Sequence, residues 1–432
     1  MASAVDYART KFSNTSIRDT DSMQQQELIP HLFRTEFSKI TAVLCKTFGI
    51  KHIEAAEDIA SETFLAAIES WTYKGIPPNP VAWLYAVAKN KAITFLKRNQ
   101  VFEQKIAKSL LQMNSEEDET KIDLSESNIT DSQLQMLFAI CNPVIAAEAQ
   151  IGLALRILCG FGIDEIANAF LTGKDTINKR LFRAKEKLRE ANVMIELPAA
   201  PAIEQRLENV LATLYLLFNE GYYSETKNEV IREELCLEAI RLNYLLLENP
   251  ATATPSAKAL LALMCFHASR LAARKGLHGE LILYEDQDTS LWNTELISKG
   301  SRYLHEASVG NTLSPYHLEA AIAYWHTIRE DKPEKWVAVL QLYDQLLAIK
   351  YSPVAAMNRI YALAKVKGKL VAIDEALPLA MHTNPFWLAL MGELYSGIED
   401  RKAISFFEKA IALVDAGAAK KLLRHKLDLL KK

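Results

Sequence analysis

The residues best suited to chemistry in this chain of 432 residues form a cationic run between positions 174 and 189. Seven residues of the run are basic and two, Asp175 and Glu186, are acidic. Lysine and arginine neutralise phosphates, so a helical face built from them indicates binding to a nucleic-acid backbone. The basic residues are Lys174, Lys179, Arg180, Arg183, Lys185, Lys187 and Arg189. The alternative is an ordinary surface helix whose basic face is solvated.

Two helices joined by a tight turn at residues 171–173 are expected to position this run. Thr172 is predicted to cap the second helix, with Asp175 completing a capping box. The first helix has an apolar face of Ile163, Ile166, Ala167 and Phe170, and the second has one of Ile177, Leu181, Ala184 and Leu188. In a helix-turn-helix the second helix enters the major groove. Its predicted DNA contacts are Lys174, Thr176, Asn178, Lys179 and Arg183.

The segment LRILCGFGIDEIANAFLTGKDTINKRLFRAKEKLR resembles region 4 of sigma factors of the extracytoplasmic-function (ECF) type. The basic residues around the small Ala184 are typical of that region. The resemblance covers residues 134–192. It implies that this part contacts the flap of RNA polymerase and the −35 promoter duplex.

A stripe of carboxylates marks the helix predicted after Gly49. Glu54, Asp58, Glu62 and Glu69 follow one another at steps of four, four and seven residues, which places them on one face. This stripe is either a solvated acidic face or a docking face for a basic partner helix.

The next helix is predicted from Pro80, after the break at residues 77–80. Aromatic side chains alternate there with cations, a combination that suits single-stranded DNA, whose bases stack and whose phosphates need neutralising. For Trp83 the alternative is a place in the hydrophobic core. The predicted DNA contacts are Trp83, Lys89, Asn90, Lys91, Thr94 and Arg98.

Residues 27–98 resemble sigma region 2. The segment AEDIASETF is similar to region 2.2, and PVAWLYAVAKNKAITFLKR is similar to regions 2.3 and 2.4. The resemblance implies that Asp58 and Glu62 contact the clamp helices of core polymerase. It also implies that the second segment melts and binds the −10 element.

The remaining polar segments of the N-terminal half are predicted to be flexible. Residues 1–26 have no hydrophobic stretch of a secretion signal and form a leader. Residues 99–133 are acidic at 115–133, without an apolar period, and form a linker between the two modules.

The C-terminal half is predicted to be a helical extension at 198–317 followed by tetratricopeptide-like (TPR-like) repeats at 318–432. Tyr343, Ala376 and Phe407 stand 33 and 31 residues apart, and Ala403, Phe407 and Ala410 keep the repeat's second-helix spacing. LYLLFNEGYY, LLALMCFHASR and LYEDQD resemble the extension of one subgroup of ECF sigma factors. This implies that the extension regulates activity, and a protein or peptide is a further expected partner of the repeats.

A metal-dependent enzyme is a further hypothesis, besides a sigma factor and a helical repeat scaffold. Its acids would be Glu220, Glu285, Asp286 and Asp288, and its bases His267, His317 and His326. The acids at 285–288 match no metal loop and are better explained as capping a helix start. We therefore predict no catalytic residue, no metal site and no cofactor.

Composition is consistent with a cytoplasmic, all-α protein. Glycine and proline are scarce, the formal net charge is −3, and no apolar run is long enough to cross a bilayer. The five cysteines form no CxxC pair and are expected to be buried thiols. We expect a sigma factor that binds core RNA polymerase and promoter DNA to initiate transcription. The alternative is a helical repeat scaffold without promoter-directing activity.

Overall fold

The computed structural model describes residues 20–107, 122–170, 172–223, 229–274, 276, 282, 284–310, 313–414 and 418–431. All regular elements in these ranges are helices, which confirms the all-α prediction. The chain divides into two units, Met1–Ala253 and Thr254–Lys432. Within the described ranges, no helix combines the length and the apolar character that a bilayer crossing requires.

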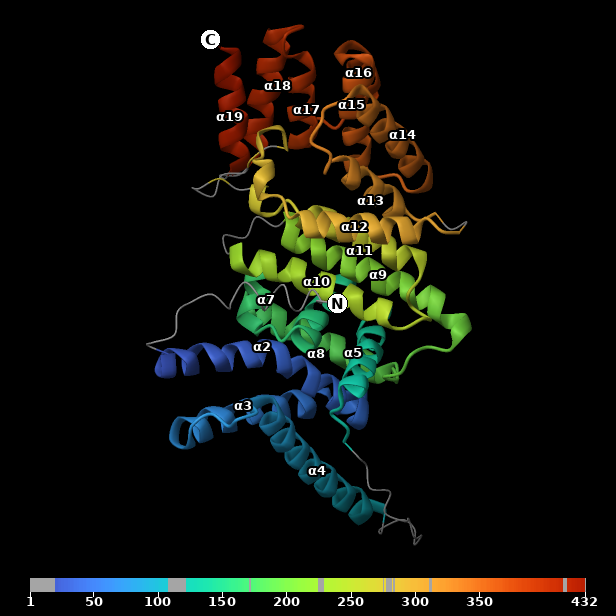
Figure 1. Cartoon of the computed structure of the whole chain (residues 1–432). Helices are drawn as coiled ribbons and strands as arrows, with labels where there is room; N and C mark the ends of the chain where they lie inside the picture. Colours follow the sequence, from blue (N-terminus) through green and yellow to red (C-terminus); the bar gives the residue numbers. More distant parts are fainter. Residues whose placement is uncertain are drawn as a thin grey trace. The chain divides into compact units, whose positions relative to one another are not determined.

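Unit 1 begins with three long helices. They are α2 (Thr20–Phe48), α3 (Ile53–Lys74) and α4 (Pro80–Ala107), with the short 3-10 helix η1 (Ile50–His52) before α3. Helix α2 packs against both α3 and α4 (Figure 1). Gly49 and Gly75 end the first two helices with φ near +79° and +78°, a region that glycine enters without strain.

The second part of unit 1 is a set of shorter helices, and the first of them packs back onto α2. These are α5 (Glu126–Ile140), α6 (Ala147–Leu153), the π-helix η2 (Ala154–Leu158), α7 (Ile163–Ala169) and α8 (Lys174–Glu190). Helices α9 (Ala200–Tyr223) and α10 (Glu229–Glu248) complete the unit. They pack on each other and on α5, and α9 also contacts α6 while α10 contacts α7.

Two sequence boundaries differ from the structure. The linker expected at 99–133 is helical at both ends, because α4 continues to Ala107 and α5 begins at Glu126. Ile129 and Leu134 of α5 are buried, so this segment is part of the core despite its polar composition. The residues expected to be a leader include the start of α2 at Thr20. The rest of the leader and residues 108–121 lie outside the described ranges.

Unit 2 opens with α11 (Pro255–Ala268), α12 (Thr294–Ala307) and α13 (Pro315–Trp325), with the 3-10 turns η3 (Ala272–Arg274), η4 (Tyr284–Asp286) and η5 (Thr289–Leu291) between α11 and α12. The array continues with α14 (Pro333–Ile349), α15 (Pro353–Lys367), α16 (Lys369–Ala376), η6 (Leu377–Leu379), α17 (Pro385–Tyr395), α18 (Asp400–Leu413) and α19 (Ala418–Leu430).

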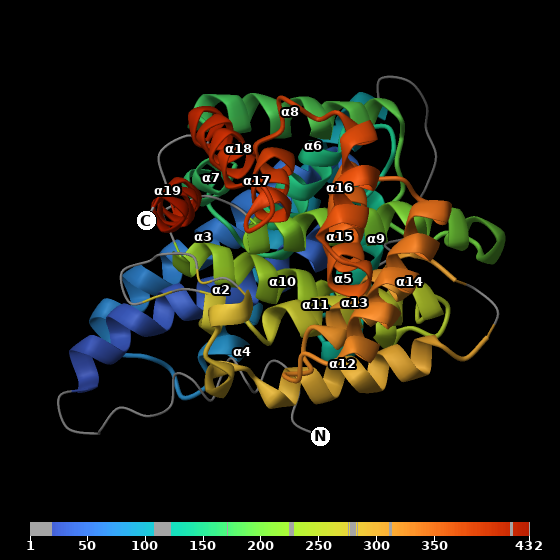
Figure 2. The same cartoon turned by 90° about the horizontal axis from the view of Figure 1, so that it is seen from above.

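The array of unit 2 consists of successive helix pairs, α13–α14, α15–α16 and α17–α18. They stand side by side in Figure 1, and Figure 2 shows α17–α19 nearly end-on. Tyr343, Ala376 and Phe407 lie on the second helix of successive pairs, in one continuous hydrophobic core. Gly392 allows α17 to approach α18, since a Cβ there would stand 2.9 Å from the ring of Phe407. The three spaced residues thus fall on equivalent helices of successive pairs, and the TPR-like assignment stays a prediction.

Candidate nucleic-acid interface

Helix α7 ends at Ala169 and α8 begins at Lys174, on either side of the predicted turn, whose residue 171 lies outside the described ranges. Helix α8 has the two predicted faces. Its apolar residues, Ile177, Leu181, Ala184 and Leu188, are all buried. The N-cap is Gly173, which corrects the expected cap at Thr172. The Gly173 backbone is extended, and with no side chain it makes no side-chain cap to the helix. The Lys174 ammonium lies 2.5 Å from Asp164 of α7.

The outward face of α8 carries the polar residues that were predicted to contact DNA. All five are exposed, and they lie on the first two and a half turns of the helix: Lys174, Thr176, Asn178, Lys179 and Arg183. Exposed cations close to a helix N-terminus present both side-chain charge and the positive end of the helix dipole. This face is therefore suited to phosphates and base edges.

The C-terminal half of the cationic run has a different role from the one predicted. The Lys185 ammonium is buried and pairs with the carboxylate of Glu57 on α3. The same carboxylate accepts a 2.8 Å hydrogen bond from the guanidinium of Arg156 in η2. Arg189 pairs with Glu54, also on α3. Lys185 and Arg189 thus join α8 to α3 and are not part of the free cationic face.

Glu57 is the site residue that sequence reasoning missed. Its side chain is only 8% exposed and holds two cations from distant parts of the chain. The stripe at 54, 58, 62 and 69 was expected to be either a solvated acidic face or a docking face for a basic helix, and Glu54 does contact such a helix, α8 of the same chain. Glu57 stands beside that stripe, and its partner Lys185 is 128 residues away.

The rest of the acidic stripe on α3 faces solvent. Asp58, Glu62 and Glu69 are exposed, and Glu62 pairs with Lys91 of α4 at 2.6 Å. Leu65 belongs to the same stripe by helical spacing and is 58% exposed. A large apolar side chain among carboxylates is a feature of protein-binding surfaces, and the spacing of 58, 62, 65 and 69 could have identified it.

On α4 the predicted DNA contacts separate into exposed and partly buried residues. Lys89, Asn90, Thr94 and Arg98 are exposed. Lys91 is half-buried in its ion pair with Glu62. Trp83 is also half-buried, with its ring centroid 5.4 Å from that of Trp71 in an edge-to-face contact. Trp83 is therefore anchored to the core by one edge and partly accessible by the rest of its surface.

The neighbouring Tyr85 fixes α4 to α2. Its hydroxyl donates a 2.6 Å hydrogen bond to the carboxylate of Glu36, which is buried. Burial and the hydrogen bond to Glu36 raise the pKa of Tyr85, so the phenol stays protonated. This contact fixes the orientation of the α4 face that carries the exposed cations.

Arginine side chains of α9 and α10 donate hydrogen bonds to main-chain carbonyls of α5 and η2. Arg206 donates to the carbonyl of Phe138 at 2.5 Å, and Arg241 donates to the carbonyl of Leu158 at 2.6 Å. Leu158 ends the π-helix, where the backbone departs from the regular helical hydrogen-bond pattern. Arg34 of α2 is bonded to both Glu165 of α7 and Glu234 of α10. The contacts tie α2, α7 and α10 together.

The catalytic and metal candidates have structural roles where the contacts are described. Asp288 caps η5 through a 2.9 Å bond from the Ser290 amide, as the capping interpretation expected. His317 accepts from the Ser314 amide, and its other nitrogen contacts the Ala307 carbonyl at 3.2 Å. Burial raises the pKa of Glu220. In the described part of the chain, histidine, cysteine and acidic residues form no group of three or more that could hold a metal.

Comparison with known proteins gives two family matches. Residues 38–101 match sigma-70 region 2, which supports a sigma-70 family factor, and residues 206–308 match a family of unknown function (DUF6596). The chain is also 33% identical over 387 residues to an uncharacterized protein of Rhizobium meliloti (strain 1021), covering 88% of this chain and 90% of that protein. No solved structure matches it significantly.

Proposed function

The chain belongs to the same family as the Rhizobium meliloti protein and carries sigma-70 region 2, and from this premise we propose that it is an ECF-type sigma factor. It binds core RNA polymerase and directs initiation at specific promoters. The observation that supports this most strongly is the presence in one unit of two separate DNA-type surfaces. One is the aromatic and basic face of α4, and the other is the exposed cationic face of α8.

In this proposal the exposed residues of α3 and α4 act together. Asp58, Glu62 and the newly identified Leu65 form the docking face for the polymerase clamp helices. The face of α4 captures the −10 strand, with Trp83 offering a ring for base stacking and Lys89 and Arg98 neutralising phosphates. This surface also includes Asn90, Lys91 and Thr94. When DNA binds, Lys91 leaves Glu62 and pairs with a phosphate.

Helix α8 binds the −35 duplex through Lys174, Thr176, Asn178, Lys179 and Arg183. The −10 and −35 elements are about 25 base pairs apart, which is about 85 Å at 3.4 Å per base pair. Helix α4, with 28 residues, is only about 42 Å long, and α8 is in direct contact with α3. In this arrangement the two surfaces are therefore too close together to bind the −10 and −35 elements at the same time. We therefore propose that the described state of unit 1 is a closed, inactive one.

The extension provides the means of regulation in this proposal. Arg206 and Arg241 of α9 and α10 bond to backbone carbonyls of the α5–η2 region, and Glu234 bonds to Arg34. These contacts stabilise the closed arrangement of α2 and α5–α8. Opening would require them to break together with the pairs between α3 and α8. The TPR-like pairs of unit 2 provide a surface for a protein or peptide that controls this step.

The test is run-off transcription with purified core polymerase and the full-length chain, on promoter fragments selected from genomic DNA by that mixture. The double change Lys179→Ala and Arg183→Ala should weaken promoter binding and lower the salt slope of log K by about 1.8, because two phosphate contacts are lost. The control is Arg401→Ala with Lys409→Ala, which removes the same charge from exposed positions of unit 2.

Transcription that is equal in both double variants would refute the assignment of α8. The scaffold alternative makes a different prediction. A scaffold would not retain core polymerase subunits in a pulldown, whereas a sigma factor would.

A further inference from the structure

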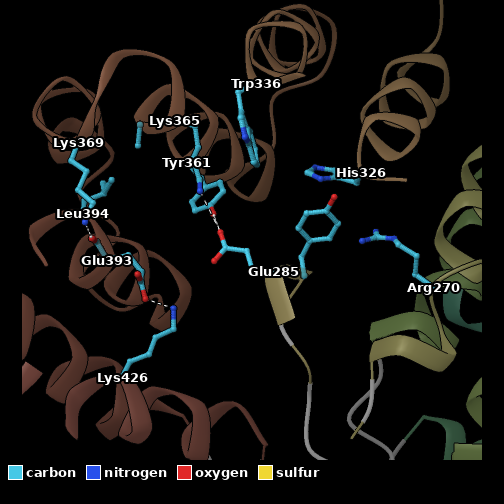
Figure 3. Close-up of a pocket in the computed structure, with 12 residues that line it drawn as sticks. Arg270, Glu285, His326, Trp336, Tyr361, Lys365, Lys369, Glu393, Leu394 and Lys426 are labelled. Atoms are coloured by element: carbon cyan, nitrogen blue, oxygen red, sulfur yellow. Dashed lines mark hydrogen bonds and ion pairs between the residues drawn. The ribbon is translucent and has the colours of Figure 1, made fainter. Parts of the chain in front are cut away.

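A cavity of about 580 Å³ opens within unit 2, between the turn η4 and the helices α14, α15 and α17. This volume is in the range of pockets for small molecules. Figure 3 shows Arg270 and His326 on one side of the cavity, and Lys369, Glu393 and Lys426 on the other, with Tyr361 and Glu285 between them. The two sides are both basic, but their cations differ in how they are satisfied.

The cations on the α17 side already have partners. Lys369 donates to the carbonyls of Glu393 and Ser396 at 3.0 and 2.7 Å. Lys426 pairs with the carboxylate of Glu393. Lys365, between the two sides, lies 3.3 Å from Glu285. Each of these ammonium groups is therefore hydrogen-bonded or ion-paired within the protein.

Arg270, on the opposite side, has no such partner. It is only 7% exposed, and no carboxylate in the described ranges lies within ion-pair distance of it. Its Nε atom is buried without a hydrogen-bond partner. The guanidinium instead lies 5.3 Å from the ring centroid of Tyr284. A buried charge that lacks a counter-ion is costly, so such a group indicates an anion that the site receives from outside.

Lys335 adds to the positive charge of this side, whereas the buried His326 stays neutral there. Lys335 is 2% exposed, and its ammonium donates to the Tyr284 hydroxyl at 2.8 Å and to the Ile328 carbonyl at 2.9 Å. The Nδ1 atom of His326 is buried without a hydrogen-bond partner. Burial is the main reason that the pKa of His326 is lowered to about 3, and the charges of Arg270 and Lys335 contribute less.

The acids that face this side are few and occupied. Asp331 accepts a hydrogen bond from the indole nitrogen of Trp336, although its charge also stabilises the Lys335 ammonium. Glu285 accepts from the Tyr361 hydroxyl at 2.9 Å and pairs with Lys365. Neither is within ion-pair distance of Arg270. The positive potential on this side is therefore not cancelled within the described residues.

The wall between the two sides is aromatic. Trp336 and Tyr361 meet edge to face with ring centroids 5.6 Å apart, and His326 lies 6.0 Å from Trp336 in a similar contact. Rings that line a cavity in this way bind flat apolar groups. A ligand that places an anionic group beside Arg270 would therefore lay a flat group along Tyr361 and Trp336.

We propose that this cavity is a binding site for a small organic anion, in which a carboxylate or phosphate pairs with Arg270 and a flat ring packs against Tyr361. A small molecule is favoured over an acidic peptide because Arg270 is buried and lines the cavity. The proposal stands on unit 2 alone and does not depend on the function proposed for unit 1.

The test is calorimetric titration of the full-length chain with phenyl phosphate and with benzoate, the simplest aromatic phosphate and carboxylate. Inorganic phosphate and benzyl alcohol each lack one half of the ligand and should bind at least about tenfold more weakly. Arg270→Gln should weaken binding of both aromatic anions by about tenfold to a hundredfold, because a charge-assisted hydrogen bond is lost. Arg401→Gln, at an exposed arginine of α18, is the matched control and should change nothing.

A second variant covers the case in which Arg270→Gln does not fold. Lys365→Gln changes a partly exposed side chain at the rim and should weaken binding by a smaller factor. Failure of both aromatic anions to bind at about 10 mM would overturn the proposal. Equal binding by the Lys365→Gln variant and the Arg401→Gln control would overturn it too. Tighter binding of hexaglutamate than of either probe would show that the site takes an acidic peptide instead.

Discussion

The change Glu57→Gln should open unit 1. Glu57 joins α3 to both η2 and α8, through Arg156 and Lys185. The glutamine has nearly the same shape, so packing is retained while the negative charge is lost. Two largely buried cations are then left without their main counter-ion.

The size of the effect follows from the burial of the three groups. Removing one partner of a buried ion pair costs about 3–5 kcal/mol when the remaining charge is fully buried. Here the Arg156 and Lys185 side chains retain 21% and 11% exposure, and Lys185 keeps a longer contact of 3.9 Å with Glu54. We therefore expect a loss of about 2 kcal/mol, or about thirtyfold in the ratio of closed to open molecules.

The assay is a distance measurement between spin labels placed on α3 and α8. Tyr73→Cys and Phe182→Cys introduce labelling sites at positions that are 89% and 61% exposed. The five native cysteines are all buried free thiols and should not react under native conditions. The wild-type background should give a single distance, and Glu57→Gln should add a population at longer distances.

The control is Glu295→Gln, which removes an exposed i,i+4 pair with Lys299 in unit 2. Such pairs contribute about 0.5 kcal/mol or less, so the distances should not change. If Glu57→Gln gives the same distance distribution and the same unfolding free energy as this control, the contact between α3 and α8 does not maintain a closed state.

Three further outcomes follow from unit 2 and from the cysteines. The pKa of His326 is about 3 in the folded chain and about 6.5 when unfolded, so the unfolded state binds more protons below pH 6.5. Lowering the pH from 6.5 to 5 should therefore reduce the unfolding free energy of unit 2 by about 2 kcal/mol through this group. Urea titration should show that His326→Asn removes that part of the pH dependence, while the same change at the exposed His305 does not. Burial raises the pKa of Cys141 and of Cys265 to about 12. At pH 8 these thiols should therefore react with a disulfide reagent on the order of a thousandfold more slowly in the native chain than in denaturant. Fast reaction of the native chain would contradict their burial. Gly392→Ala should lower the unfolding free energy by about 1–3 kcal/mol, because its Cβ would meet the Phe407 ring at 2.9 Å, and an unchanged urea midpoint would show that α17 can move away.

Periodicity predicted the elements of the candidate interface well. The apolar face of α8 and its exposed cationic residues are local patterns, because every fourth or third residue shares a face. The predicted N-cap of α8 was wrong by one residue, because Gly173 occupies the position that Thr172 was expected to fill. The three spaced residues of unit 2 fall on equivalent helices of successive pairs.

Partners far apart in sequence could not be predicted in this way. Nothing near Lys185 shows that it meets Glu57 on a different helix, and the sequence shows it only as one of the basic residues of the run. Polar composition likewise hid α5 within the expected linker, although Gln133 is buried and lies 3.4 Å from Ser38 of α2. The cavity of unit 2 combines residues from 270 to 426, which only the tertiary structure brings together.

Binding of the full-length chain to purified core RNA polymerase tests the central claim most directly. Sedimentation of the mixture should show a complex for wild type and a tighter one for Glu57→Gln, because the open molecule exposes both modules. Leu65→Asp, which places a charge in the proposed docking face, should weaken the complex in both backgrounds. Absence of a complex with wild type and with Glu57→Gln alike would contradict the assignment of this chain as a sigma factor.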